Sequence, residues 1–206
     1  MSISWTAKVR KSTLEKLPPD QLLPDTQPKY VASWIYTFGV LTIAAFVMLV
    51  ASGLILTIKG PNWWHVSHLG HFINSIHLWN VELFFAFMVI HLWGKFWMAA
   101  WRGKRFATWA TGIFAFIGSI VTAFTGYLIQ TNFDSQWIAT QAKDSFNSTG
   151  IGAIINPLNT GQAILLHVAM LPLILGLIVV VHIILVRRKG VVTPISNDHQ
   201  YMEGKF

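Results

Sequence analysis

The sequence predicts an all-α integral membrane protein whose four transmembrane helices form one bundle. Three observations support this fold class: 53% of the 206 residues are hydrophobic, only 11% are charged, and several long apolar runs follow one another along the chain. Soluble domains carry about 25% charged residues, so this composition suits a membrane better than water. The chain contains no cysteine, which excludes disulfides, thiolate metal sites and any cofactor attached through a thioether.

Four apolar runs are long enough to cross a bilayer, at residues 34–58, 72–93, 107–129 and 163–186. The first contains no charged residue, and as a helix it reaches about 37 Å, which crosses a bilayer core with some tilt. Glu82 is the only formal charge in the second run, and the fourth is followed by the basic stop Arg187, Arg188, Lys189 and Gly190. We expect further structure only in the two longer connections, 59–71 and 130–162.

The segments outside the predicted bundle are polar. Residues 1–33 are dotted with prolines and lysines and contain no apolar run that would serve as a cleavable signal, so we expect this amino-terminal tail to be retained. The bundle then covers residues 34–190, and residues 191–206 form a carboxy-terminal tail.

Lysine and arginine are distributed unequally between the two sides of the predicted bundle. Thirteen of them lie in the tails and in the connection between the second and third spans, whereas only Lys59 and Lys143 lie in the two longer connections. The positive-inside rule therefore predicts that both termini are cytoplasmic, on the negative side of the membrane. Because the basic excess is a topology signal, we do not expect nucleic acid as a partner.

Four of the eight histidines lie inside apolar runs, His77 and His91 in the second run and His167 and His182 in the fourth. These two runs cross the membrane in the same direction, so His77 pairs in depth with His167, and His91 pairs with His182. Fourteen helical residues rotate by about 1400°, about 40° short of four turns, so His77 and His91 share one helix face. The sequence therefore predicts two sites at different depths, each with two imidazoles.

Paired imidazoles at matched depth indicate two b-type haems that are bound without a covalent link. Bis-histidine ligation fills both axial positions of the iron, so such haems carry electrons rather than bind oxygen. Zinc or copper fits less well, because no third protein ligand is visible at either depth. A histidine in a span can instead be structural and bonded to a backbone carbonyl, but four in this pattern are costly without a function.

Four glycines repeat the histidine spacing of fourteen residues, Gly39 and Gly53 in the first run and Gly112 and Gly126 in the third. A glycine at the depth of each haem would let a porphyrin edge approach the backbone closely. Small residues also serve ordinary helix packing in membranes, although packing motifs favour spacings near four. We expect these four glycines to line the haem sites.

The fourth span has one residue more between its histidines than the second. Fifteen residues rotate about 60° beyond four turns, so a regular helix would turn His182 away from the face that carries His167. Pro172 lacks the N–H for its helical hydrogen bond and admits a kink or a one-residue bulge. The sequence therefore predicts an irregular helix near Pro172.

From about residue 28 to residue 192 the sequence resembles the haem-bearing amino-terminal half of cytochrome b, and most closely the short split form, cytochrome b6. The resemblance rests on the histidine pairs, the glycine quartet, Thr-Gly-Tyr at 125–127, Leu-His at 166–167 with Leu-Pro at 171–172, and the basic end after His182. It implies a high-potential and a low-potential haem between quinone sites on opposite sides of the membrane. It also implies that His77 and His167 hold the positive-side haem, and His91 and His182 the negative-side haem.

Three departures from the family pattern have consequences. The b6 form has a cysteine near the start of the first span that anchors an extra haem, whereas this chain has Thr37, so we expect no covalent haem. The arginine that follows the first histidine and pairs with a haem propionate is Leu78 here, so Lys59, a histidine or a partner subunit must replace it. The Pro-Glu-Trp-Tyr motif of the quinol oxidation site is absent, as expected where a separate subunit carries it.

Other polar and aromatic residues carry weaker signals. His65, His68 and His71 recur every three residues and fit one side of an interfacial helix better than a metal site. Glu82 fits a proton relay or a protonated structural residue. Asp134 and Gln136 follow the third span where the family places part of its quinol pocket. Tryptophans at the span ends fit an interfacial belt, namely Trp63, Trp64, Trp93, Trp97, Trp101 and Trp109.

These observations predict a dihaem cytochrome b subunit that carries electrons between quinone sites in a bc-type or b6f-type quinol-oxidising complex. The expected partners are a membrane subunit that completes the quinol site, an iron–sulfur or cytochrome c protein, quinone and lipid. A haem-bearing anchor that links a peripheral oxidoreductase to the quinone pool is the alternative, since it would use the same histidines. A purely structural membrane subunit would require all four histidines to be accidental.

Overall fold

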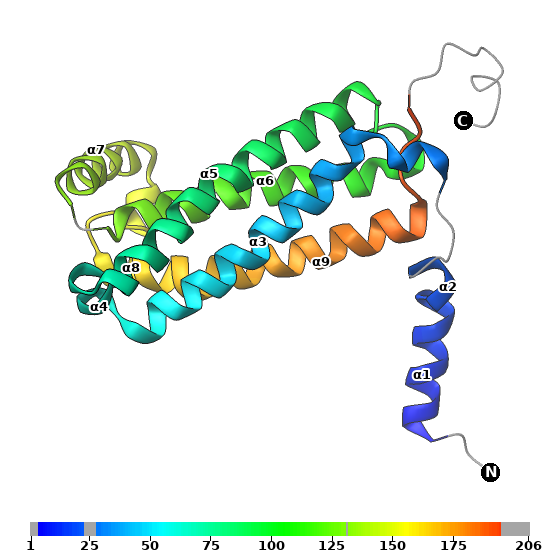
Figure 1. Ribbon diagram of the computed structural model, residues 1–206, viewed down its shortest axis with the longest axis horizontal. Helices are drawn as coiled ribbons and strands as arrows, with labels where there is room; N and C mark the ends of the chain where they lie inside the picture. Colours follow the sequence, from blue (N-terminus) through cyan, green and yellow to red (C-terminus); the bar gives the residue numbers. More distant parts are fainter. Residues whose placement is uncertain (1–3, 23–27, 131, 195–206) are drawn as a thin grey trace.

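The computed structural model describes residues 4–22, 28–130 and 132–194, and these residues form helices without any β-strand. Within this part of the chain four helical segments are long and apolar enough to cross a membrane (Figure 1). They are α3 (Trp34–Lys59), α5 (His68–Trp97), α6 (Phe106–Leu128) with the short η2 (Gly103–Arg105) before it, and a composite last span over Thr160–Lys189. The predicted all-α fold with four spans is confirmed, and the chain is a multi-pass membrane protein.

The last span is composite because its helical hydrogen bonding changes within it. It begins as α8 (Thr160–Leu165), continues through a π-helical turn, η4 (Leu166–Met170), and ends as α9 (Leu171–Lys189). The irregularity predicted next to Pro172 is confirmed. A π turn accommodates one residue more than an α turn, so it absorbs the residue by which this span exceeds α5 between its two histidines.

Local sequence signals end the spans and start the shorter helices. Gly60 ends α3 with φ of 79°, a left-handed conformation that glycine adopts without strain. The next residue begins α4 (Pro61–Val66), where a proline at the first helical position loses no hydrogen bond. Ser67 then caps α5, because its side chain accepts a hydrogen bond from the amide of Gly70 at 2.8 Å.

The four spans associate as two antiparallel pairs. α3 packs mainly against α5, and α6 packs mainly against α9, whereas contacts between the two pairs are few among the described residues. Inside the first pair Ala45, Phe84 and Met88 are buried at mid-depth, and Phe116 of α6 packs against this cluster from the second pair. An apolar layer therefore separates the upper and lower halves of the bundle.

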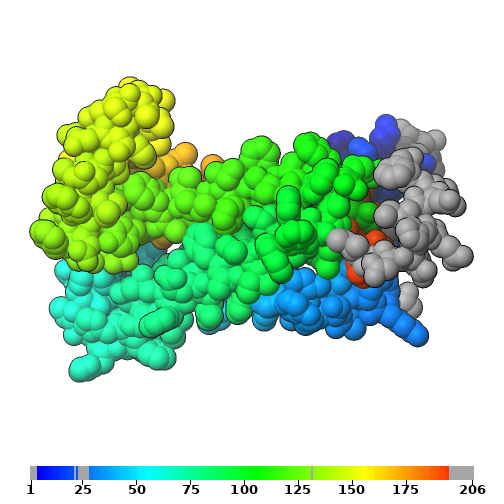
Figure 2. Space-filling view, turned by 90° about the horizontal axis from the view of Figure 1, so that it is seen from above, coloured from blue at the N-terminus to red at the C-terminus, as the bar shows by residue number. Residues whose placement is uncertain are grey.

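The connections between the spans lie at the two ends of the bundle. α4 and α7 (Phe133–Thr149) lie at one end, and α7 stands out from the bundle there (Figures 1 and 2). Asn132 caps α7 by accepting the amide hydrogen of Ser135 at 2.8 Å. At the other end lie α2 (Pro19–Leu22), η1 (Lys29–Ala32) and the carboxyl end of α9.

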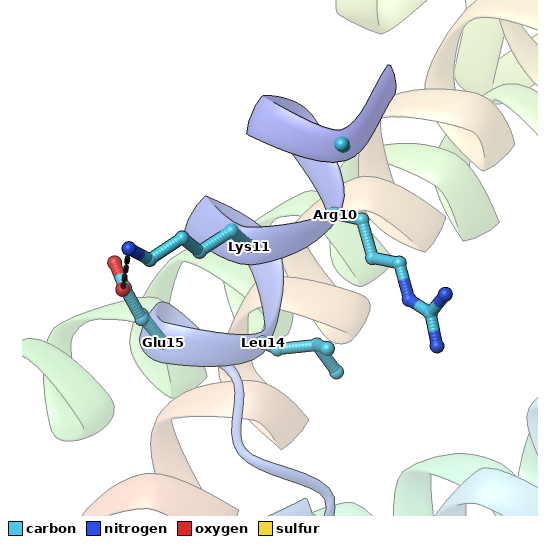
Figure 3. Close-up of a pocket in the computed structure, with 5 residues that line it drawn as sticks. Arg10, Lys11, Leu14 and Glu15 are labelled. Atoms are coloured by element: carbon cyan, nitrogen blue, oxygen red, sulfur yellow. Dashed lines mark ion pairs between the residues drawn. The ribbon is translucent and has the colours of Figure 1, made fainter. Parts of the chain in front are cut away.

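The amino-terminal tail contains a helix that the sequence analysis did not predict. α1 (Trp5–Lys16) starts at Ser4, whose hydroxyl accepts the amide hydrogen of Ala7, and it runs across the long axis of the bundle. Its side chains are mostly exposed, and Lys11 and Glu15 form an ion pair at 4.0 Å one turn apart (Figure 3). Such an exposed pair adds only a few tenths of a kcal/mol, so α1 is stabilised mainly by local helical bonds.

Two tyrosines fasten the amino-terminal segment to the segment that follows α9. The hydroxyl of Tyr36 donates to the carbonyl of Val192 at 2.8 Å, and the hydroxyl of Tyr30 donates to that of Val191 at 3.3 Å. Lys95 at the end of α5 lies over the Tyr36 ring, with Nζ 3.8 Å from its centroid. These contacts hold the two described ends of the chain on the same side of the bundle.

Candidate functional site

The first candidate site is formed by His77 of α5 and His167 of the π turn η4. Their ring centroids lie 6.3 Å apart and the ring planes are inclined by 83°. A metal–imidazole bond is about 2.0 Å long and the nitrogen lies about 1.2 Å from the ring centre, so two imidazoles on opposite sides of one metal would have centroids about 6.4 Å apart. The observed separation therefore fits one metal ion between the two rings.

The second candidate site lies toward the other end of the same two spans, at His91 of α5 and His182 of α9. These two rings are close enough to interact electrostatically. The structure thus brings together the residues that the sequence analysis pairs by depth. Fourteen residues of α5 separate His77 from His91, which is about 21 Å along the helix axis.

Hydrogen bonds fix the orientation of three of the four imidazole rings. Nδ1 of His167 lies 2.8 Å from the carbonyl of Thr122, which can only accept, so Nδ1 carries the hydrogen. Nδ1 of His77 lies 2.9 Å from the Ser52 hydroxyl, and Nδ1 of His182 lies 3.0 Å from the Thr111 hydroxyl. A hydrogen on Nδ1 leaves Nε2 as the nitrogen with a free lone pair for a metal.

Each of the four predicted glycines faces one of the four histidines. A Cβ atom added to Gly39 would lie 3.0 Å from Cε1 of His91, and one added to Gly53 would lie 3.2 Å from Cε1 of His77. At Gly112 the corresponding distance to Cε1 of His182 is 3.2 Å, and at Gly126 the added atom would collide with the His167 ring. From the sequence we expect each of these glycines to let a porphyrin edge approach the backbone. The structure places an imidazole ring against each of them.

The hydroxyl residues before these glycines are functional candidates that the sequence analysis missed. Ser52, Thr111 and Thr125 directly precede Gly53, Gly112 and Gly126. A recurrent Ser-Gly or Thr-Gly pair at the histidine spacing was the available sequence signal. Two of these hydroxyls bond an imidazole directly, so they belong to the site.

Two further buried polar groups lie near the start of α6, close to the end of the bundle that holds His91 and His182. Within the described residues, Nε of Arg105 and Oγ1 of Thr108 are buried and have no hydrogen-bond partner. Both are donors, and unsatisfied buried donors are rare in folded proteins. They fit the carboxylate groups of a haem bound at the neighbouring histidine pair.

The remaining polar candidates do not join these sites. His65 lies on α4, whereas His68 and His71 lie on the first turn of α5, so the single interfacial helix expected for them was wrong because Ser67 breaks it. Among the described residues no group of three or more histidine and acidic side chains is placed to hold a metal ion. Glu82 is exposed on α5, about 140° around the helix from His77.

A small apolar cavity lies beside the His167 site. Its volume is about 100 Å³, and its walls include Phe124, Leu128, Phe146 and Leu171 from α6, α7 and α9. Asp134 lies in the first turn of α7, where its charge favours the helix amino terminus. Asp134 and Gln136 are not among the cavity-lining residues.

Comparisons with known proteins agree with this geometry. The family described as Cytochrome b(N-terminal)/b6/petB matches residues 82–205, which is more than half of the chain. Cytochrome b6 of Chlamydomonas reinhardtii is 26% identical, over 88% of this chain and 96% of its own length. A cytochrome bc complex cytochrome b subunit of Chlorobaculum thiosulfatiphilum is 27% identical, over 86% of this chain and 46% of that protein.

A solved structure shows the same fold. A chain of a structure described as "Hyperthermophilic respiratory Complex III" superposes with a TM-score of 0.71 at 21% identity, over 90% of this chain and 54% of that one. The family match and the four-span bundle with matched histidine and glycine positions lead to one conclusion: this chain belongs to the cytochrome b N-terminal/b6 family.

Proposed function

We propose that this chain is a dihaem cytochrome b subunit that carries electrons across the membrane between quinone sites. The observation that carries the proposal is the pair of imidazoles at His77 and His167, 6.3 Å apart, with Nδ1 of each ring hydrogen-bonded. His91 and His182 form a second pair of imidazoles at the other depth, where Nδ1 of His182 is hydrogen-bonded to Thr111 and Nδ1 of His91 has no partner among the described residues. Two levels about 21 Å apart cover most of a hydrocarbon core of about 30 Å.

The residues of the chain bind and orient the cofactor. In three of the four rings Nδ1 is held by a hydroxyl or a carbonyl, which leaves Nε2 as the nitrogen that would bind the iron. A b-type haem held by His77 with His167, or by His91 with His182, would supply reversible one-electron transfer at iron. The buried layer around Phe84 and Met88 keeps water out between the two levels.

We propose that the chain works within a bc-type or b6f-type complex. Its relatives include proteins described as cytochrome b6 and as a cytochrome b subunit of a bc complex. The Pro-Glu-Trp-Tyr motif is absent from the sequence, so a second membrane subunit would complete the quinol oxidation pocket. An iron–sulfur or cytochrome c protein would accept electrons, and both termini would lie on the cytoplasmic, negative side.

The test compares the isolated chain with the assembled complex. The purified chain should hold two haems, release both into acid acetone because no cysteine is present, and be reduced by dithionite. It should oxidise quinol only when the partner subunits are restored. One haem per chain, haem left on the polypeptide, or rapid quinol oxidation by the isolated chain would contradict the proposal.

An anchor for a peripheral oxidoreductase is the second candidate. Leu78 and Thr37 occupy positions where the b6 resemblance implies arginine and cysteine, and these departures favour a different complex. The anchor needs only one quinone site, near the His91 and His182 pair, and a soluble enzyme docked on the membrane. The subunits that copurify with the chain decide between the two candidates: an iron–sulfur protein with a short quinol subunit supports the first, and a molybdenum or nickel enzyme supports the second.

A further inference from the structure

The histidine environments share a repeated unit on α3 and α6. Each unit contains a glycine that faces the imidazole, a residue directly before the glycine, and a carbonyl group four residues before the glycine. In three of the four units the residue before the glycine is serine or threonine, at Ser52, Thr111 and Thr125. In the fourth unit it is Phe38, which precedes Gly39.

Two of the hydroxyl groups are held as acceptors toward the imidazole. The Ser52 hydroxyl donates to the carbonyl of Met48 at 2.7 Å, so its oxygen is free to accept the Nδ1 hydrogen of His77 at 2.9 Å. The Thr111 hydroxyl lies 3.0 Å from the carbonyl of Ala107 and 3.0 Å from Nδ1 of His182, which is the same arrangement. The carbonyl groups of Leu49 and Thr108 also lie near these two rings.

The third unit uses the backbone alone. The carbonyl of Thr122 accepts from Nδ1 of His167 at 2.8 Å, and it also accepts from the Thr125 hydroxyl at 2.8 Å. The carbonyl of Thr122 is four residues before Gly126, so it corresponds to the carbonyl groups of Leu49 and Thr108 in the other units.

The fourth unit makes no hydrogen bond to its imidazole among the described residues. Within the part of the chain that the structure describes, Nδ1 of His91 is buried and has no hydrogen-bond partner. The Phe38 ring packs against Phe87, one turn before His91, with centroids 6.1 Å apart. The nearby Lys95 interacts electrostatically with His91, but an ammonium group has only donors and cannot accept the Nδ1 hydrogen.

We propose that Phe38 leaves Nδ1 of His91 without an acceptor and so makes His91 the least basic of the four imidazole ligands. Ser52 and Thr111 have the opposite effect and raise the basicity of His77 and His182 as ligands. This inference rests on the proposed function, since it assumes that the two histidine pairs hold haem iron. An acceptor on Nδ1 raises the basicity of a ligand imidazole. A more basic ligand stabilises oxidised iron, so the midpoint potential of the haem falls.

The decisive variant is Phe38→Ser, which places in the fourth unit the residue that the Ser52 unit already has. The experiment is a redox titration of the haem absorption bands in membranes that contain the assembled complex. We expect the wave of the haem held by His91 and His182 to move to lower potential, with the ratio of oxidised to reduced haem changing about tenfold, or about 59 mV for one electron. Phe38→Leu is the matched control, because it removes the aromatic ring without supplying an acceptor, and it should leave the wave in place.

The reverse variants remove an existing acceptor. Thr111→Val should raise the same wave that Phe38→Ser lowers, because both positions act on ligands of one haem, and Ser52→Ala should raise only the other wave. These shifts should be smaller than that of Phe38→Ser, since the carbonyl groups of Thr108 and Leu49 remain. Ser119→Ala is the control, because the Ser119 hydroxyl is bonded to the carbonyl of Ala115 at 2.7 Å on the same helix as Thr111.

The outcomes separate this inference from the function on which it rests. If alanine at the four histidines leaves the haem content unchanged, the proposed function fails. If both haems are present but Phe38→Ser leaves the potential and the low-spin electron paramagnetic resonance signal unchanged, only the present inference is overturned. If Phe38→Ser does not assemble, Thr111→Val decides: an upward shift of its wave supports the inference, and no shift or a downward shift overturns it.

Discussion

Replacing Gly126 by alanine tests whether the glycines are required because imidazole rings lie against them. The added Cβ would collide with the His167 ring, whose Nδ1 lies 2.8 Å from the position of that atom. Ordinary contact begins at 3.4 Å, so Nδ1 must retreat by about 0.6 Å and the still nearer Cε1 by more, or the two helices must separate. Either movement also strains the hydrogen bond from Nδ1 to the carbonyl of Thr122 at 2.8 Å.

The magnitude follows from two opposing effects. Alanine gains about 1 kcal/mol over glycine in helix propensity, whereas overpacking a filled site costs about 1–3 kcal/mol. Disturbing the groups that orient a metal ligand, here the hydrogen bond from His167 to Thr122, typically lowers metal affinity by about 10 to 100-fold. We therefore expect Gly126→Ala to lose haem selectively from the site of His77 and His167, while the bundle itself remains folded.

Gly118→Ala on the same helix is the matched control. There the added Cβ would lie 3.8 Å from Leu175, an ordinary contact, so both haems should be retained. The assay is the haem content of purified protein together with the reduced-minus-oxidised spectrum. Gly39→Ala should be intermediate, because its nearest ring atom is at 3.0 Å, and Gly53→Ala and Gly112→Ala should be mildest, each with its nearest ring atom at 3.2 Å. Full haem content in Gly126→Ala, or equal damage from Gly118→Ala, would refute this reasoning.

Three further predictions concern the ligands, the last span and the tail. His91→Ala and His182→Ala should each abolish the same haem wave in a redox titration, and loss of different waves would contradict the pairing. Deleting Ala169 should convert the π turn to regular α-helix and preserve both haems. Deleting Val179 from α9 should instead rotate His182 by about 100° and remove its haem. The haem content of the purified variants checks both outcomes. Tyr36→Phe removes a hydrogen bond of 2.8 Å to the segment after α9, so it should cost about 1 kcal/mol and lower the thermal unfolding midpoint; an unchanged midpoint would show that this bond contributes nothing.

The spans could be predicted because hydrophobic runs in a membrane have few alternatives to a helix. The run at 34–58 became α3 almost residue for residue. The run at 72–93 was too short, since α5 extends from His68 to Trp97. The helix continues through polar residues such as Lys95 where the span leaves the hydrocarbon. A search for apolar runs ends before these residues and therefore underestimates the length of the helix.

The matched histidines and the surplus residue of the last span were also visible in the sequence, because helical rotation is simple arithmetic. The hydroxyl groups of Ser52 and Thr111 were not, since a single serine or threonine in a span commonly bonds its own helix. Their role depends on the register between α3 and α5 and between α6 and α9. The helix α1 escaped prediction because it buries no residue, so no apolar periodicity marks it.

The association of the spans in two antiparallel pairs has a consequence for biogenesis. α3 and α5 together contain His77 and His91 with the glycines that face them, and α6 and the composite last span contain His167 and His182 with theirs. Each helical hairpin therefore presents one prepared half of both sites as soon as it is inserted. The first hairpin leaves the ribosome earlier, so its two imidazoles are in place before the second hairpin arrives, and on the proposed function we expect the two halves to close around the haems as the last step of maturation rather than the first.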